Sequence, residues 1–481
     1  MRSSAKPAPQ ADAPAPQADA DGFRVLLVST YELGHQPLGL ASPAAWLADA
    51  GAHVTCNDLS IDPLDEAAVR DSDLIAIHLH MHASTRLALA ALDRVKALNA
   101  SAHICFYGLY APLNEDLLRR RGGHTVLGGE FEEGLVALLR RLAGGDNTEQ
   151  VEPVISLAKQ RFQVPARDGL PALSEYAHLR TADGPRTVGY VEASRGCKHR
   201  CRHCPVVPVY DGTFRVVQSD VVLDDIRRQV DGGAEHITFG DPDFFNGVGH
   251  ALALVEALHA TFPRLTYDAT IKVEHLLRHA RHLRLLADTG CQFVTTAVES
   301  VDDRVLGLLD KGHTRDDFAD AVVLARDAGL TLSPTFMPFT PWATPDGYLD
   351  LLRQIVELDL IAHVAPVQLV IRMLVTYGSR LLELEEVRRM VGEFDADALA
   401  YPWAHEDPAV DRLQADLTAV VAEGETAGDS RQTVFARLWH RAHAACGLEA
   451  PLLATNDAMV PHLSEPWYCC AEPTAGQLAA I

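Results

Sequence analysis

Three cysteines occur within residues 194–205 at the spacing Cys-x3-Cys-x2-Cys, directly after an apolar, strand-like run at residues 187–193. They are Cys197, Cys201 and Cys204. Cysteine thiolates hold iron–sulfur clusters, and short spacings allow one loop to wrap a single cluster. Three thiolates bind three irons of a [4Fe–4S] cluster, which leaves the fourth iron open to a ligand that is not protein.

This loop resembles that of the radical S-adenosylmethionine (SAM) superfamily. The resemblance implies that SAM binds the open iron through its amino and carboxylate groups, and that an electron from the cluster cleaves its sulfonium. His203 precedes the last cysteine, where the superfamily carries an aromatic ring beside the adenine. The alternative is a structural zinc loop completed by His199 or His203, because zinc prefers four ligands in tetrahedral geometry.

Composition narrows the class of protein. The 481 residues carry a net charge of −23, which argues against non-specific nucleic-acid binding through phosphate contacts. No apolar run approaches the ~20 residues needed to span a bilayer, so we expect no membrane partner. The first residues lack the apolar core of a signal peptide, and the nine cysteines are clustered. We therefore expect a cytoplasmic protein whose cysteines serve metal or redox chemistry.

The pattern of apolar runs predicts five segments. Residues 1–22 contain a duplicated Pro-Ala-Pro-Gln-Ala-Asp-Ala heptapeptide and too little apolar surface to fold, so they are predicted to be disordered. The other four are a Rossmann-like domain at 23–142, a linker rich in proline and glycine at 143–186, a barrel at 187–378 and a helical C-terminal region at 379–481.

The first domain alternates short apolar strands with helices, which predicts an α/β fold with a doubly wound parallel sheet. In such folds a ligand lies outside the carboxyl ends of the strands. Strand order and spacing resemble the cobalamin-binding-type domain that precedes the barrel in one branch of the superfamily. The resemblance implies cobalamin as an additional cofactor, with loop positions at Gly108, Gly129 and Glu130. The alternative is a flavodoxin-like sheet that has lost its ligand and only covers the barrel.

The second domain contains six predicted strand–helix units, fewer than the eight of a full barrel. This number matches the partial (βα)6 barrel of the radical SAM fold. The predicted strands are 187–193, 236–239, 265–270, 292–297, 331–336 and 367–370.

Four barrel residues are candidate SAM ligands by this resemblance. Gly240 and Asp241 end the second strand, where the superfamily contacts the SAM amino group. Glu299 lies in a Glu-Ser segment followed by Lys-Gly-His and would bind the ribose or organise the carboxylate. Arg372, after the sixth predicted strand, would pair with the SAM carboxylate as a planar fork. The alternative for each is a solvated strand-end residue or a helix cap.

Near the C-terminus, Cys469 and Cys470 open an intact Cys-Cys-Ala-Glu-Pro pentapeptide. It resembles the CUAEP/CCAEP-tail radical SAM family, in which many members carry selenocysteine at one of these positions. A position that accepts selenium implies thiol redox chemistry, soft-metal ligation or nucleophilic attack at the active site. The alternative is an exposed pair without function, which would be prone to oxidation.

Two hypotheses follow. The first is a radical SAM enzyme with a [4Fe–4S] cluster that transfers a methyl or other carbon group, acts on a small molecule and takes electrons from a reductant such as flavodoxin or ferredoxin. The second is a sensor or chaperone for a metal or metalloid such as arsenic or selenium, with a structural cluster and the tail cysteines as its binding site.

Overall fold

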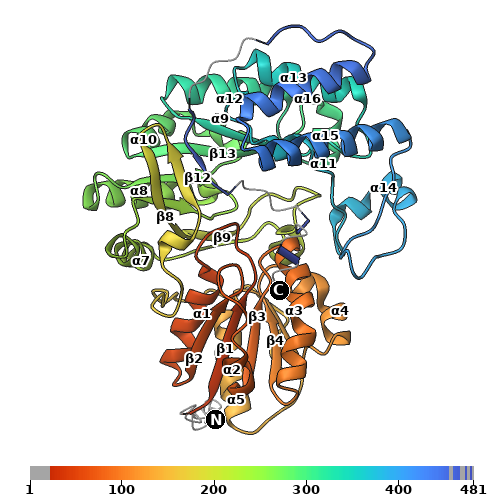
Figure 1. The fold of residues 1–481 in the computed structure, drawn as a ribbon. Helices are drawn as coiled ribbons and strands as arrows, with labels where there is room; N and C mark the ends of the chain where they lie inside the picture. Colours follow the sequence, from red (N-terminus) through yellow and green to blue (C-terminus); the bar gives the residue numbers. More distant parts are fainter. Residues whose placement is uncertain (1–21, 454–458, 466–471, 474–476, 479–481) are drawn as a thin grey trace, which may run out of the picture.

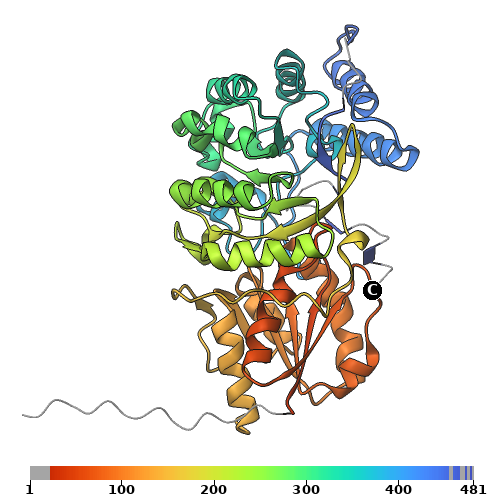
Figure 2. The same ribbon diagram turned by 90° about the vertical axis from the view of Figure 1, so that its left-hand side faces the viewer.

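The computed structural model describes residues 22–453, 459–465, 472–473 and 477–478. Figure 1 shows an N-terminal layered domain, with a larger sheet and its helices stacked on it. Figure 2 shows the same stacking from the side. The tail predicted to be disordered lies outside the described residues, except for Gly22.

The N-terminal sheet has six strands in the order β2-β1-β3-β4-β5-β6, and every neighbouring pair is parallel. The first five follow the 2-1-3-4-5 order of doubly wound folds, which confirms the predicted fold class. The strands are β1 (Arg24–Ser29), β2 (His53–Asp58), β3 (Leu74–His78), β4 (His103–Tyr107), β5 (Thr125–Gly129) and β6 (Ile155–Ser156).

Helices cover both faces of this sheet because its central strands are apolar on both sides. Val25 and Leu27 pack with the helices α1 and α5, whereas Leu26 and Val28 pack on the opposite face with α3. The helices are α1 (Leu38–Asp49), α2 (Glu66–Asp71), α3 (His82–Leu98), α4 (Glu115–Arg120) and α5 (Glu132–Ala143). The short helix α2 and the edge strand β6 were not predicted.

The second sheet has seven strands in the order β14-β13-β12-β11-β8-β7-β15. From β8 to β14 all neighbours are parallel, whereas β7 and β15 extend the other edge in antiparallel pairing. The strands are β7 (His178–Thr181), β8 (Gly184–Val191), β11 (His236–Phe239), β12 (Thr266–Thr270), β13 (Cys291–Glu299), β14 (Leu332–Phe336) and β15 (His462–Leu463). A separate hairpin pairs β9 (Ser194–Gly196) with β10 (Phe214–Val216).

The predicted sixth barrel strand at 367–370 is wrong. This segment forms the 3-10 helix η5 (Pro366–Leu369), because proline at its first position fixes φ and removes a backbone donor. The sixth place in the sheet is marked only by an isolated parallel bridge between Phe339 and Arg372. The barrel therefore has five parallel strands among the described residues.

Helices pack around the outside of this sheet, and the last two form a hairpin against it (Figure 1). The predicted helix at 273–286 is divided into two by a 3-10 turn. The helices are α6 (Val207–Tyr210), α7 (Ser219–Asp231), α8 (Val248–Thr261), α9 (Val273–Arg278), α10 (Leu283–Asp288), α11 (Asp303–Leu309), α12 (Arg315–Asp327), α13 (Pro345–Glu357), α14 (Glu385–Met390), α15 (Pro408–Ala427) and α16 (Arg431–Ala445). Within the described ranges, no helix has the length and apolar character required to span a bilayer.

Candidate active site

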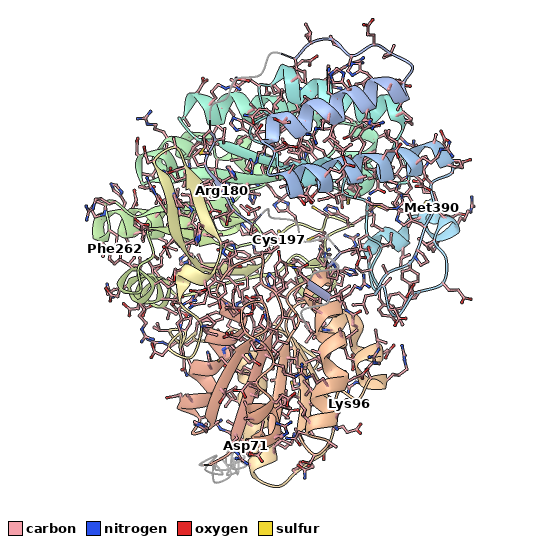
Figure 3. All side chains as sticks on the ribbon, viewed as in Figure 1. Asp71, Lys96, Arg180, Cys197, Phe262 and Met390 are labelled. Carbon is pink, nitrogen blue, oxygen red and sulfur yellow. The ribbon has the colours of Figure 1, made fainter. Side chains whose placement is uncertain are left out.

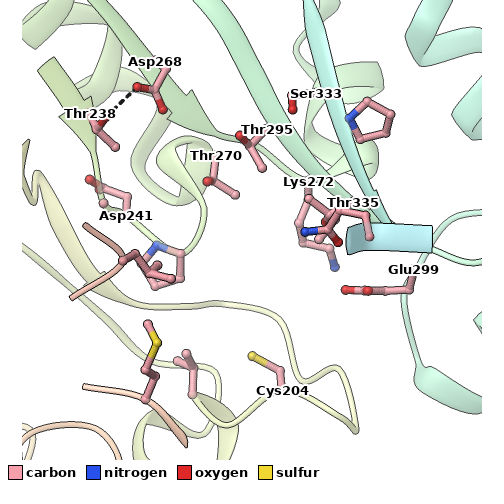
Figure 4. Close-up of a pocket in the computed structure, with 18 of the residues that line it drawn as sticks. Cys204, Thr238, Asp241, Asp268, Thr270, Lys272, Thr295, Glu299, Ser333 and Thr335 are labelled. Carbon is pink, nitrogen blue, oxygen red and sulfur yellow. Dashed lines mark hydrogen bonds between the residues drawn. The ribbon is translucent and has the colours of Figure 1, made fainter. Parts of the chain in front are cut away.

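A cavity of about 270 Å³ opens at the carboxyl ends of the parallel barrel strands, where it faces the N-terminal domain. Figure 4 shows the polar side chains that line it, which come from β11, β12, β13 and β14. These polar residues occupy every second position along a strand, because successive side chains of a strand point to opposite faces and only one face lines the cavity. The set is Thr238, Asp268, Thr270, Thr295, Glu299, Ser333 and Thr335. Of these residues only Glu299 is predicted from the sequence, although the alternation of polar residues along the strands is visible there.

The cysteine loop lies at the junction of the two domains, where Figure 3 labels Cys197. Cys197 and Cys201 are buried, Cys204 is half-buried, and all three line the cavity. The Asn246 side chain holds the loop by accepting from the Lys198 amide at 3.1 Å and donating to the Gly196 carbonyl at 3.3 Å. Three thiols on one constrained loop fit the donor set of an iron–sulfur cluster with an open iron.

Two buried ammonium groups lie close to these cysteines. The Nζ of Lys272 is 3.7 Å from the Sγ of Cys201, and the ammonium of Lys311 pairs with Glu299 at 3.3 Å. Burial acts to lower the pKa of Lys311, but Glu299 and Cys201 raise it above its ordinary value. Burial raises the pKa of the Cys197 thiol to about 11, so cations are needed for thiolates to persist here.

Glu299 is the last residue of β13, and its side chain contacts His203 of the cysteine loop. The Nε2 of His203 lies 3.1 Å from one Glu299 oxygen, and the Lys311 ammonium contacts the same oxygen. Burial alone would raise the pKa of Glu299, but Lys311 and His203 lower it to about 2. Glu299 also has a φ of +70°, a strained conformation typical of functional sites. The structure thus brings His203 and Glu299 together beside Cys204 on the cavity wall.

Gly240 and Asp241 also line the cavity, at the carboxyl end of β11. A side chain at Gly240 has no room, because its Cβ would lie 1.9 Å from the Tyr190 hydroxyl. Asp241 accepts from the Ala193 amide at 2.9 Å and from the Ser194 hydroxyl at 2.5 Å. Burial raises the pKa of Asp241 to about 7.

The structure does not bring Arg372 to this cavity. Its guanidinium donates to Asp411 at 2.7 Å and to the Trp403 carbonyl at 2.8 Å, and it stacks 3.6 Å above the Trp403 ring. The neighbouring residue, Ile371, lines the cavity instead. The predicted pairing of Arg372 with a SAM carboxylate has no support from its position, because Asp411 and Trp403 hold its guanidinium.

Glu130 lies in a buried charge cluster at the junction of the domains. It accepts from the Tyr210 hydroxyl at 3.1 Å, and one of its oxygens is 3.6 Å from Arg195. Arg195 pairs with Glu132 and with Glu192, each at 2.7 Å. Burial raises the pKa of Glu130 to about 7, against the opposing effect of Arg195. Glu130 therefore joins the two domains through protein contacts.

The other loop positions test whether the first domain fits cobalamin. The crevice between the carboxyl ends of β1 and β3 is filled by the His78 ring, which pairs with Glu32 at 2.7 Å. A Cβ added at Gly39 would lie 2.0 Å from that ring, and one at Gly108 2.8 Å from it. At Gly129, which has a φ of +70°, a Cβ would lie 2.2 Å from the Ser156 carbonyl oxygen. With His78 in this position, the glycines do not form an open cradle for a cofactor tail.

Cys469 and Cys470 lie outside the described residues. Described residues on both sides of the pair contact the N-terminal domain. Glu465 lines the cavity and accepts from the Tyr31 hydroxyl, and Glu472 pairs with Arg86 and contacts the Nε2 of His82 at 3.2 Å.

Comparison with known proteins agrees with this geometry. Residues 191–355 match the Radical SAM superfamily. The predicted radical SAM domain is confirmed for this part of the chain. The matched residues include the three cysteines and the carboxyl ends of β11 to β14.

Relatives extend the likeness beyond this domain. The hopanoid C-3 methylase of Methylococcus capsulatus is 27% identical over 327 residues, which cover 64% of this chain and 62% of that protein. A tRNA-2-methylthio-N(6)-dimethylallyladenosine synthase of Chlorobium phaeobacteroides is 26% identical over 204 residues, or 40% of this chain and 44% of that protein. The matches thus span less than two thirds of these curated relatives.

Solved structures share the two-domain fold. The cobalamin-dependent SAM radical enzyme OxsB, with aqua-cobalamin and SAM bound, superposes with a TM-score of 0.68 at 16% identity and covers 84% of this chain and 67% of its own. The radical SAM methyltransferase TsrM from Kitasatospora setae, with cobalamin and a [4Fe–4S] cluster bound, has a TM-score of 0.56 at 18% identity and covers 70% of each chain.

Proposed function

We propose that the chain is a radical SAM enzyme that cleaves SAM reductively and transfers a methyl or other carbon group to a small molecule. One observation carries this proposal: three cysteines line the same cavity as the polar strand ends of a parallel barrel. The family match of residues 191–355 and the methylase and methyltransferase relatives support it. They favour an enzyme over the alternative of a metal or metalloid sensor.

In this proposal Cys197, Cys201 and Cys204 hold the [4Fe–4S] cluster, which supplies the electron that reduces the SAM sulfonium. Lys272 and Lys311 offset the negative charge of the thiolates and the cluster, because charges in a dry site interact strongly. The reducing electron comes from a partner such as flavodoxin or ferredoxin.

SAM binds across the open side of the cavity. His203 packs beside the adenine, while Glu299, kept ionised by Lys311 and His203, accepts hydrogen bonds from the ribose or orients the amino acid part. The backbone at Gly240 and Asp241 contacts the SAM amino group. Arg372 has no part in this arrangement, since Asp411 and Trp403 hold it.

The tail supplies the second reactive centre. We propose, from the CCAEP pentapeptide, that Cys469 and Cys470 act at the product-forming step as redox thiols, nucleophiles or soft-metal ligands. The contact of Glu465 with the cavity and of Glu472 with His82 supports this, because both ends of the segment lie against the domain that faces the cavity.

Cobalamin is proposed as an additional cofactor from the relatives OxsB and TsrM, whose structures contain it. Gly108 and Gly129 remain the proposed positions for its tail, whereas Glu130 is already paired with Tyr210. The His78 ring must leave its position over Gly39 and Gly108 before a tail can enter.

The test is anaerobic reconstitution with iron and sulfide, followed by addition of SAM and dithionite. We expect cluster-dependent consumption of SAM and release of 5′-deoxyadenosine or another SAM fragment. A Cys469→Ser, Cys470→Ser double variant should still consume SAM but fail to form the final product, whereas Cys446→Ser serves as a matched thiol control. Intact SAM in the presence of a full cluster would overturn the proposed function.

A further inference from the structure

A second set of metal-binding side chains lies beside the cysteine loop and is separate from the cysteines. His199 lies within the loop, Asp243 follows β11, and His275 lies on α9. One donor atom from each residue lies within 4.8 Å of the other two. The Oδ2 of Asp243 is 2.7 Å from the Nδ1 of His275 and 3.5 Å from the Nε2 of His199.

These donors are buried, and among the described residues none of them has a hydrogen-bond partner with normal angles, although Asp243 and His275 are within hydrogen-bond distance. The side chain of Asp243 is 0% exposed, that of His275 4% and that of His199 16%. The Oδ2 of Asp243, the Nδ1 of His275 and the Nε2 of His199 are all unsatisfied, although they face one another. Buried polar atoms are normally satisfied, so three such atoms around one point indicate a missing common partner.

Neighbouring groups orient these side chains as ligands. The Oδ1 of Asp243 accepts from the Phe245 amide at 3.1 Å, which leaves Oδ2 directed at the histidines. The Nδ1 of His199 lies 3.5 Å from Glu274, on the side of the ring away from Asp243. A carboxylate behind a histidine is the usual arrangement around a metal, because it fixes the tautomer and the ring orientation.

We propose that His199, Asp243 and His275 bind one zinc ion. Ligand atoms about 2.0–2.1 Å from zinc in tetrahedral geometry are about 3.3 Å apart. The 3.5 Å between Asp243 and His199 is close to this value, whereas the 2.7 Å between Asp243 and His275 must lengthen when zinc binds. Two imidazoles and a carboxylate suit zinc, which such ligands bind more tightly than ferrous iron. Water takes the fourth position on the exposed side of His199.

This ion would add a direct link between three parts of the wall, in addition to the hydrogen bonds of Asn246. His199 lies between Cys197 and Cys201, so zinc would tether the cysteine loop to the β11 end and to α9. The role is structural: the ion positions the loop that carries the cysteines. It does not depend on the proposed reaction.

The test measures zinc in the full chain after the cysteines have been filled by reconstitution with iron and sulfide. Zinc is added, loosely bound metal is removed by desalting, and zinc and iron are counted by mass spectrometry. We expect about one zinc per chain. Asp243→Asn and His275→Asn should each lower zinc affinity tenfold or more, whereas the matched control His282→Asn, in the 3-10 turn (Ala280–His282) that follows α9, should bind as the wild type does.

Two further readouts identify the site. Cobalt in place of zinc should show the visible bands of nitrogen and oxygen ligands without the intense charge-transfer bands of thiolates. Zinc should also raise the melting temperature of the wild type, and a chelator should reverse the rise, which decides the matter if a triad variant fails to fold. The proposal would be overturned if the wild type takes up no zinc and its melting temperature does not change. It would also be overturned by thiolate charge-transfer bands with cobalt, by equal zinc uptake in the triad variants, or by an extra iron in place of zinc.

Discussion

The two sheets of this protein direct the carboxyl ends of their parallel strands at the same junction, but their side chains treat that edge differently. In the N-terminal sheet the crevice between β1 and β3 is occupied by the His78 ring, which pairs with Glu32. In the barrel, hydroxyl and carboxylate groups surround a cavity of about 270 Å³. Strand topology determines where a site can form, but the side chains on and near the strand ends determine whether that site is open.

The largest expected effect follows from removing one of the three predicted cluster ligands. Cys201→Ala should lose most of the iron and lower SAM turnover by at least about a thousandfold, equivalent to about 4 kcal/mol. Iron analysis and SAM consumption measure this, with Cys446→Ala as control. Full iron content in Cys201→Ala would remove the ligand assignment.

A smaller loss is expected from Glu299, the charged group held between His203 and Lys311. Glu299→Gln should weaken SAM binding about 10- to 100-fold, or about 1.4–2.7 kcal/mol, because charge-assisted hydrogen bonds are lost. Calorimetric titration with SAM gives the affinity, and the exposed Glu256→Gln is the control. Unchanged affinity would place SAM elsewhere.

The closed crevice of the N-terminal sheet can be opened by two substitutions made together. His78→Ser, combined with Glu32→Gln to avoid an unpaired buried charge, should raise the amount of bound hydroxocobalamin about tenfold over wild type. The visible spectrum after gel filtration measures the corrin. Equal binding by wild type and variant would show that His78 does not block the tail.

The smallest effect concerns Glu130, at the junction. Its pKa of about 7 in the folded chain exceeds the ordinary value of 4.5. Between these two pH values the folded chain keeps a proton on Glu130 that the unfolded chain releases. The wild type therefore loses stability as the pH rises from about 4.5 to 7. The melting temperature of Glu130→Gln relative to wild type should therefore rise by a few degrees between about pH 4.5 and 7, and then level off. A flat difference, as expected for the exposed control Glu133→Gln, would contradict this.

Much of the fold could be predicted because strands such as β4 and β11 are short apolar runs between polar turns. The sixth barrel strand could not, since apolar residues at 367–370 are equally compatible with the 3-10 turn that Pro366 begins. The cysteine loop and Glu299 were visible as motifs. Lys272 and the triad of His199, Asp243 and His275 were not, because their proximity depends on contacts between segments distant in sequence.

The most direct test of the central claim is magnetic resonance of the reduced cluster with SAM labelled at its amino nitrogen and carboxylate oxygen. If Cys197, Cys201 and Cys204 leave one iron open toward the cavity, SAM should change the spectrum of the cluster and show hyperfine coupling from both labels. A spectrum that SAM does not alter, in protein with a full cluster, would contradict the claim.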